Sequence, residues 1–98
     1  MNTYAFTSAL WQSESTAPWV FVSVPQDVSD AIRHVPRPPK PGFGSVRVNV
    51  TIGETTWQTS IFPEKNDGPY VLPVKKAVRA AEGAEIGDAM DVTIETLE

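Results

Sequence analysis

One unit that occurs twice constrains the fold of this chain most: a strand, a proline, a short helix and a strand of alternating residues. The clearer copy is the run YVLPVKKAVRAAEGAEIGDAMDVTIE at residues 70–95. The earlier copy, at residues 19–52, has WVFVSV, Pro25, a helix-like stretch, a glycine-containing loop and SVRVNVTI. Either copy alone would leave open sheet edges, so two copies in 98 residues favour a closed barrel with internal pseudo-twofold symmetry.

Residue periodicity predicts six strands and two short helices in the order ββαβ, repeated once. The strands are expected at residues 4–11, 19–24, 45–52, 55–62, 70–72 and 89–97, from β-branched and aromatic content and from alternation. The helices are expected at residues 26–33 and 74–82, each opened by a proline, Pro25 or Pro73. Their inward faces are expected to carry Val28, Ala31 and Ile32, and Ala77, Val78 and Ala81. The predicted fold is all-β with two short helices: a double-split β-barrel built from two ββαβ units, a single domain over residues 1–98.

Composition removes several classes of function. With no cysteine, the chain has no disulfide, no thiolate zinc site and no thiol nucleophile. Its one histidine, His34, excludes a site that needs two imidazoles from one chain, and we expect it to be a solvated loop residue. No P-loop, dinucleotide-binding, zinc or calcium signature is present. The sequence therefore predicts no metal and no cofactor.

The sequence predicts a cytoplasmic protein without membrane contact. The first basic residue is Arg33, so the start of the chain lacks the charged region of a secretory signal. No apolar run approaches the roughly 18 residues that span a bilayer. The net charge of −4 opposes non-specific binding of a polyanion over the whole surface.

Three basic residues at the start of the second predicted helix, Lys75, Lys76 and Arg79, form the first candidate site. Lys75 and Arg79 are i, i+4 neighbours and could grip a phosphate or carboxylate together. Cations at a helix N-terminus oppose the helix dipole, which favours a bound anion or an acidic neighbour as compensation. A solvated helix face is the commoner meaning of such charges.

Ser45 and Arg47, beside Gly42-Phe43-Gly44, form a second candidate anion site. A guanidinium and backbone N–H groups freed at the glycines could bind an anion together. The alternative is an arginine at a hairpin entrance, paired with Glu54 or Asp91.

A third candidate lies on one predicted strand: Trp57, Gln58, Thr59 and Ser60, with Phe62. A tryptophan on a hairpin is more often part of the core than a stacking platform. The hydroxyls of Thr59 and Ser60 have no histidine partner in a catalytic arrangement, since the one histidine, His34, lies in the predicted proline-rich loop at residues 34–44. Nothing positive in the sequence supports an enzyme.

Two family resemblances bear on the fold. LPVKKAVRAAEGAEIGD, at residues 72–88, resembles the half-barrel unit of the AbrB/MazE transcription factors, with one extra residue between proline and helix. VPQDVSDAI in the first half is similar, without the glycine and Gly-Asp continuation. GFGSVRVNVTIGETTWQTSIFP with YVLPVKKAVRAAEG resembles a small bacterial family known only as domain of unknown function nineteen-oh-five. That resemblance implies a double-split barrel, sometimes fused to a YdeI/OmpD-associated, bacteriocin-protection-type domain, and it implies no reaction.

These observations rank the possible functions. First is a non-catalytic, monomeric barrel that binds a small anionic ligand or a protein partner through Ser45, Arg47, Lys75, Lys76 and Arg79. Second is an AbrB-like nucleic-acid-binding regulator, which the acidic net charge disfavours. Third is an accessory domain in bacteriocin or stress protection, or an unrecognised enzyme.

Overall fold

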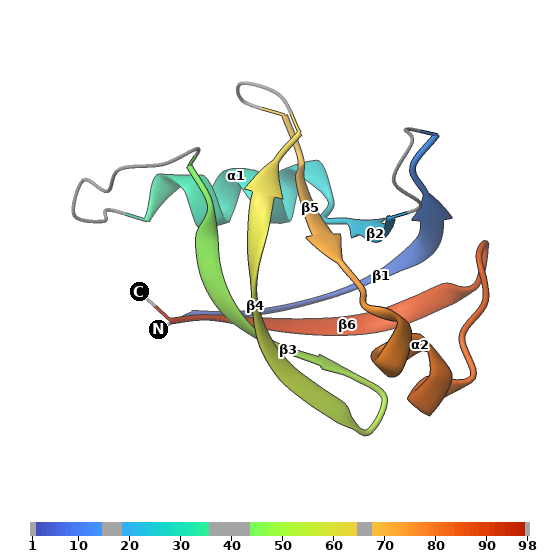
Figure 1. The fold of residues 1–98 in the computed structure, drawn as a ribbon. Helices are drawn as coiled ribbons and strands as arrows, with labels where there is room; N and C mark the ends of the chain where they lie inside the picture. The colour runs from blue at the N-terminus through green and yellow to red at the C-terminus, as the bar shows by residue number, and fades with distance from the viewer. Residues whose placement is uncertain (1, 15–18, 36–43, 65–67, 98) are drawn as a thin grey trace.

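The chain folds into a closed barrel of six antiparallel strands in the order β1-β2-β5-β4-β3-β6 (Figure 1). The computed structural model describes residues 2–14, 19–35, 44–64 and 68–97. The elements are β1 (Thr3–Gln12), β2 (Val20–Ser23), α1 (Gln26–His34), β3 (Val46–Ile52), β4 (Thr55–Pro63), β5 (Tyr70–Pro73), α2 (Lys76–Glu82) and β6 (Ala89–Thr96). The predicted all-β barrel with two short helices is confirmed. Most of the proline-rich loop, residues 36–43, lies outside the described part.

Alternation along the strands builds one core, because every second side chain of a strand faces the barrel interior. Val46, Val48, Val50 and Ile52 of β3 are buried, and so are Val92 and Ile94 of β6. The short strands β2 and β5 add Val20, Val22, Tyr70 and Leu72. Alternate residues of these four strands therefore meet in one core.

The strand register is two-fold symmetric. In the β2–β5 ladder Phe21 pairs with Pro73, Val22 with Leu72 and Ser23 with Val71, so exchanging the two strands reproduces the same pairs. Two backbone bonds of 2.9 Å continue the ladder symmetrically, from Val24 N to Tyr70 O and from Val74 N to Val20 O.

In the β3–β6 ladder the same exchange runs about the pair Thr51–Thr93 and interchanges its neighbours Val50–Ile94 and Ile52–Val92. The whole set of strand neighbours is unchanged when β1, β2 and β3 are exchanged with β4, β5 and β6. Positions in the paired parts of these strands therefore correspond between the two halves.

This register corrects the alignment of the two prolines. Pro25 is the residue before α1, as expected, but Pro73 is the last residue of β5 and lies opposite Phe21. The counterpart of Pro25 is Lys75, the residue before α2, and both have extended backbone there. Pro73 does not open a helix because the strand continues through it.

The inward faces predicted for the helices were partly wrong. Ile32 and Val78 are buried as expected, but Ala31, Ala77 and Ala81 are exposed. In α1 the buried partner of Ile32 is Ser29, a polar residue. His34 is the exposed last residue of α1 rather than part of the loop, and its Nδ1 lies 2.7 Å from Asp30 O.

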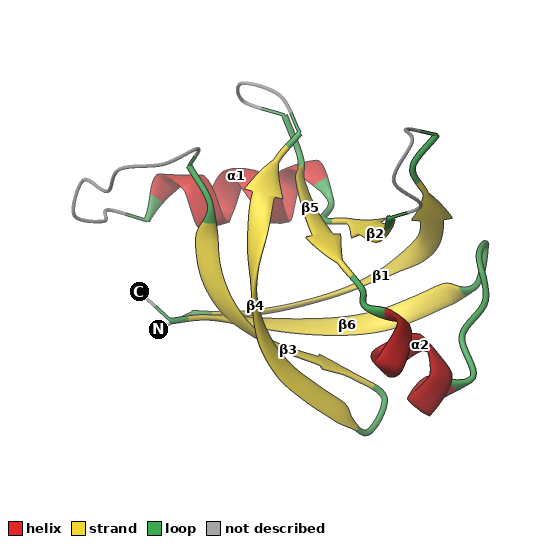
Figure 2. Cartoon of the chain, in the orientation of Figure 1, coloured by secondary structure: helices red, strands yellow, loops and turns green. Residues whose placement is uncertain are grey.

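The helices and the chain ends complete the architecture. Figure 2 shows α1 and α2 on different sides of the barrel, while the first and last strands run alongside each other. The ends are joined by hydrogen bonds from Asn2 N to Thr96 Oγ1 (3.1 Å) and from Thr96 N to Asn2 O (2.9 Å). Among the described residues, no helix has the length and apolar character needed to cross a membrane.

Candidate functional site

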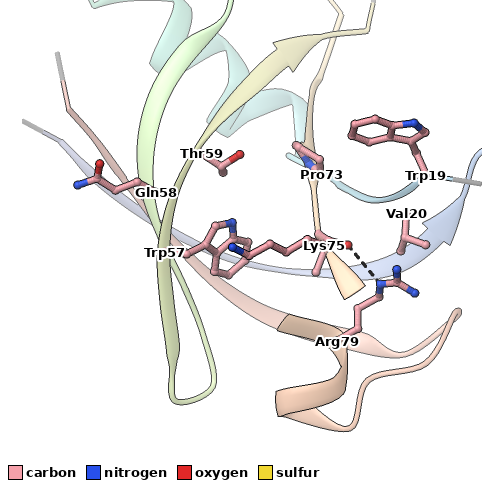
Figure 3. A pocket seen from close by; sticks show the side chains of 9 residues that line it. Trp19, Val20, Trp57, Gln58, Thr59, Pro73, Lys75 and Arg79 are labelled. Carbon is pink, nitrogen blue, oxygen red and sulfur yellow. Dashed lines mark hydrogen bonds between the residues drawn. The ribbon is translucent and has the colours of Figure 1, made fainter. Parts of the chain in front are cut away.

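A pocket of about 530 Å³ opens where β4 and β5 separate. These strands pair only at Phe62–Val71 and Pro63–Tyr70. Beyond those pairs, β4 presents Trp57, Gln58 and Thr59 to the pocket, and the chain around the end of β5 presents Pro73, Val74 and Lys75. Arg79 of α2, Val20 at the start of β2 and Trp19 directly before that strand complete the lining (Figure 3). We call this place the β4–β5 split.

The two cationic residues of the pocket lie in helix α2 and directly before it. Lys75 precedes the helix, and its carbonyl oxygen accepts hydrogen bonds from Val78 N (3.1 Å) and Arg79 N (3.2 Å). The Arg79 side chain returns to the strand, where its Nε donates to Val74 O at 3.2 Å, as the dashed line in Figure 3 shows. Arg79 is therefore oriented through one of its five N–H donors, and the terminal nitrogens are left for another partner.

The position of α2 is set at its other end by the β3–β4 hairpin. Thr55 Oγ1 donates to Glu82 Oε2 at 2.6 Å. The helix then ends at Gly83 in the left-handed conformation (φ 60°), which is common for a glycine that follows a helix. At the hairpin tip, Gly53 has a positive φ of 59°, which favours glycine, and a Cβ there would require the carboxylate end of Glu82 to shift. These contacts, with buried Val78, hold the side bearing Arg79 against the split.

Within the described part of the chain, the cations of the pocket form no ion pair with a carboxylate. The one ion pair among the described residues joins Arg33 to Asp30 at 3.3 Å, in α1. No carboxylate belongs to the described lining of the pocket. Of the two compensations considered for the basic residues at this helix start, an acidic neighbour is thus not found in the described part of the chain.

Two tryptophan side chains belong to the apolar part of the lining. Trp57 is half-buried and packs against the hydrophobic core, so it combines the core role with one face on the pocket. Trp19 is 57% exposed. Its ring stacks on Phe21, with centroids 6.3 Å apart and an interplanar angle of 15°, and Phe21 in turn contacts Trp11 at 5.1 Å.

The pocket unites residues from two of the three sites considered from sequence. Lys75 and Arg79 come from the first candidate, and Trp57, Gln58 and Thr59 from the third. Lys76, Ser45 and Arg47 do not line it: Lys76 is exposed on α2, and Arg47 Nη1 donates to Ser60 Oγ at 3.4 Å on the outer face of β3 and β4. Gly42 and Phe43, part of the second candidate, lie outside the described residues.

Sequence reasoning missed Trp19 and Pro73 as site residues. Trp19 reaches the pocket only because β2 pairs with β5, a contact between residues about fifty positions apart along the chain. One signal was available: Trp19 is a large aromatic residue directly before a buried strand, next to polar turn material.

A family described as a domain of unknown function, DUF1905, matches residues 6–94. The chain belongs to this family. The match runs from within β1 to within β6, so the whole β4–β5 split lies inside the DUF1905 domain. No curated protein matches the chain.

The chemistry available in this DUF1905 pocket is recognition by charge and stacking. Arg79 and Lys75 offer N–H donors to an anion, Thr59 and Gln58 offer neutral polar groups, and the two indoles offer flat apolar surfaces. Among the described residues, no group of three or more histidine, aspartate or glutamate side chains is placed to hold a metal ion.

Proposed function

We propose that this DUF1905 barrel is a non-catalytic binding protein that takes a small organic anion into the β4–β5 split. One observation carries the proposal: Lys75 and Arg79 both line the pocket, and neither forms an ion pair within the described chain. A protein with net charge −4 places two cations together here without internal neutralisation. An anionic ligand would supply the missing charge and accept charge-assisted hydrogen bonds.

The size and lining of the pocket support a small organic ligand. A volume of about 530 Å³ falls within the range of ligand sites, roughly 300–1,000 Å³. Such sites combine apolar walls with a few directed polar groups, and here Trp57, Pro73 and Trp19 provide the apolar part. Arg79 is already held by Val74 O, so less conformational freedom is lost when a ligand binds.

A charge-removal experiment tests the proposal. Benzoate, cyclohexanecarboxylate, inorganic phosphate and AMP are titrated into the protein, with ¹H–¹⁵N NMR shifts as the readout. We expect at least one of these anions to bind and Lys75→Gln/Arg79→Gln to weaken it by about tenfold or more, since each charged hydrogen bond contributes about 1.5 kcal/mol or more. Lys76→Gln is the matched control, because Lys76 lies next to the site without lining it. Absence of binding by all four anions, or equal binding by the double variant, would refute the proposal.

Nucleic acid is the second candidate, and one observation favours it. An exposed indole, Trp19, shares a pocket with Arg79 and Lys75, and single-stranded nucleic acids bind to combinations of aromatic and basic side chains. The net charge of −4 weighs against it. Sub-micromolar binding of a random oligonucleotide or duplex, falling steeply with added salt, would place this candidate first.

We also propose that the two halves are copies of one ββαβ unit of the AbrB/MazE type, joined in a monomer. The two-fold register of the β2–β5 and β3–β6 ladders supports this, because one chain supplies both halves of the closed barrel. Light scattering in solution should give the mass of one chain. A dimer that exchanges hairpins between chains would contradict the proposal.

A further inference from the structure

We infer that the anion bound in the β4–β5 split carries a flat aromatic ring that stacks on Trp19. The inference rests on the proposed function and adds the chemical class of the ligand. It begins with the exposure of Trp19: a side chain of this size that remains 57% exposed beside a pocket leaves indole surface for another group to cover.

Trp19 is held in place before any ligand arrives. Its ring lies nearly parallel to Phe21, with 15° between the planes, and Phe21 contacts Trp11 at 5.1 Å. Trp11 is anchored in turn, because its Nε1 donates to Ser23 Oγ at 3.0 Å. Trp19, Phe21 and Trp11 therefore form a row of contacting rings. The hydrogen bond anchors Trp11 at one end of the row, and Trp19 at the other end borders the pocket. A ring fixed this way offers a stacking surface at low entropic cost.

The cations lie within the same pocket as this ring. Figure 3 shows Trp19 near Pro73 and Val20, with Lys75 and Arg79 further along the pocket toward α2. A ligand with a ring at one end and an anionic group at the other matches that arrangement. Thr59 and Gln58 can bond polar atoms of the ring.

Two kinds of molecule share this chemistry: aromatic carboxylates and nucleoside monophosphates. Both present a flat ring and an anion, so benzoate and AMP probe the two sources separately. A Kd for AMP below that of benzoate would indicate the nucleotide source, and the reverse order the carboxylate source. Either order supports an aromatic anion as the ligand class if benzoate also binds more tightly than the non-aromatic cyclohexanecarboxylate.

The decisive comparison is between benzoate and cyclohexanecarboxylate, which have the same charge and the same number of carbons but differ in flatness. We expect benzoate to bind about fivefold more tightly, the size of effect that aromatic stacking adds beyond area burial. Trp19→Leu should remove this preference by weakening benzoate about fivefold while changing cyclohexanecarboxylate less than twofold. The matched control is Phe62→Leu, which alters a 40% exposed aromatic residue that does not line the pocket.

Trp11 is a positioning residue in this scheme, since it acts on the ligand only through Phe21 and Trp19. Trp11→Leu should reduce the benzoate-to-cyclohexanecarboxylate preference without abolishing anion binding, and Trp11→Phe should restore part of it. A purely structural role would lower both affinities equally and leave the preference unchanged.

The outcomes separate this inference from the proposed function. If both carboxylates bind equally and both are lost in Lys75→Gln/Arg79→Gln, the pocket binds anions but the aromatic class is refuted. If none of the four anions binds, both the proposed function and the inference fail, and if inorganic phosphate alone binds, only the inference fails. A preference for benzoate that persists in Trp19→Leu would refute the role of Trp19.

Discussion

Two places in this barrel have equivalent backbone and contrasting side chains: the β4–β5 split and its counterpart between β1 and β2. The register relates Ser8 to Thr59, Ser23 to Pro73 and Ser29 to Arg79. At the β1–β2 split, Ser8 Oγ donates to Ser23 O at 2.8 Å, which ties the two strands together. At the β4–β5 split, Thr59 and Pro73 instead border the pocket.

The helix residues next to the two splits, Ser29 of α1 and Arg79 of α2, differ in the same way. Ser29 is fully buried, donates to Val24 O at 3.1 Å and accepts from Tyr70 N at 3.0 Å. Arg79, its counterpart, bonds the equivalent carbonyl, Val74 O, through a much longer side chain. The backbone therefore creates both openings, and side-chain length and polarity decide which one is bridged and which can admit a ligand.

The largest effect expected from breaking this comparison is at Ser29. Ser29→Ala removes the acceptor of a buried N–H and the donor to a buried carbonyl, so the free energy of unfolding should fall by about 2–3 kcal/mol. Arg79→Ala should cost less than about 1 kcal/mol, since Arg79 is only half-buried. Urea denaturation measures both, with exposed Ser45→Ala as control. Equal losses at positions 29 and 79 would show that both splits serve stability alone.

The next largest effect concerns the aromatic residues of β1 and β4 that occupy equivalent positions. Phe6 and Trp57 are both half-buried against the core, so Phe6→Ala and Trp57→Ala should each lower the free energy of unfolding by about 2 kcal/mol, below the 3–5 kcal/mol typical of fully buried rings. Only Trp57→Ala should also weaken benzoate binding, because only Trp57 lines the pocket. Thermal denaturation and the NMR titration together check this pair. If Trp57→Ala alone lowers the free energy of unfolding by more than about 4 kcal/mol, Trp57 is a core residue without a separate role in the pocket.

The strands and the barrel could be predicted from sequence because their signal is local. Alternation places Val46, Val48 and Val50 on one face whatever the rest of the chain does, and Gly53 and Gly83 fall where a turn and a helix end need them. The helix starts could not be predicted as well. Proline is common at helix starts, so Pro73 is read from sequence as opening a helix, and only its pairing with Phe21 shows that it belongs to β5.

From the sequence, only two separate pairs of residues of the pocket could be predicted to lie together. The i, i+4 spacing brought Lys75 and Arg79 together, and strand alternation brought Trp57 and Thr59 together, but nothing local joined the two pairs. They meet through the closure of the barrel, which also brings in Trp19. Ser29 was missed for a related reason: a small polar residue on a helix looks exposed unless the buried groups that it bonds, Val24 O and Tyr70 N, are known.

A third, smaller effect distinguishes the cations of the two halves. Arg33 in α1 serves the fold: it pairs with Asp30, lies 4.9 Å above the ring of Tyr70 and donates to Gly68 O. Arg33→Gln should therefore lower the free energy of unfolding by about 1 kcal/mol, the combined size of a partly exposed ion pair and a cation–π contact. Arg33→Gln should leave anion binding intact, because Arg33 does not line the pocket. If Arg33→Gln abolishes anion binding in the same NMR titration, the anion binds near α1 rather than in the β4–β5 split.

The smallest effect on stability is expected where the effect on binding is largest. Lys75→Gln/Arg79→Gln removes two cations that have no ion pair in the described chain, and only the bond from Arg79 Nε to Val74 O is lost with them. Relief of the repulsion between the two charges offsets part of that loss, so the melting temperature should change by less than about 4 °C, which corresponds to under about 1 kcal/mol in a domain of this size. Thermal denaturation at low salt is the measurement, because screening would hide a charge effect at high salt. A fall as large as that of Ser29→Ala would mean that Lys75 and Arg79 hold the fold together as Ser29 does. The β1–β2 and β4–β5 splits would then both contribute to stability, although their side chains differ.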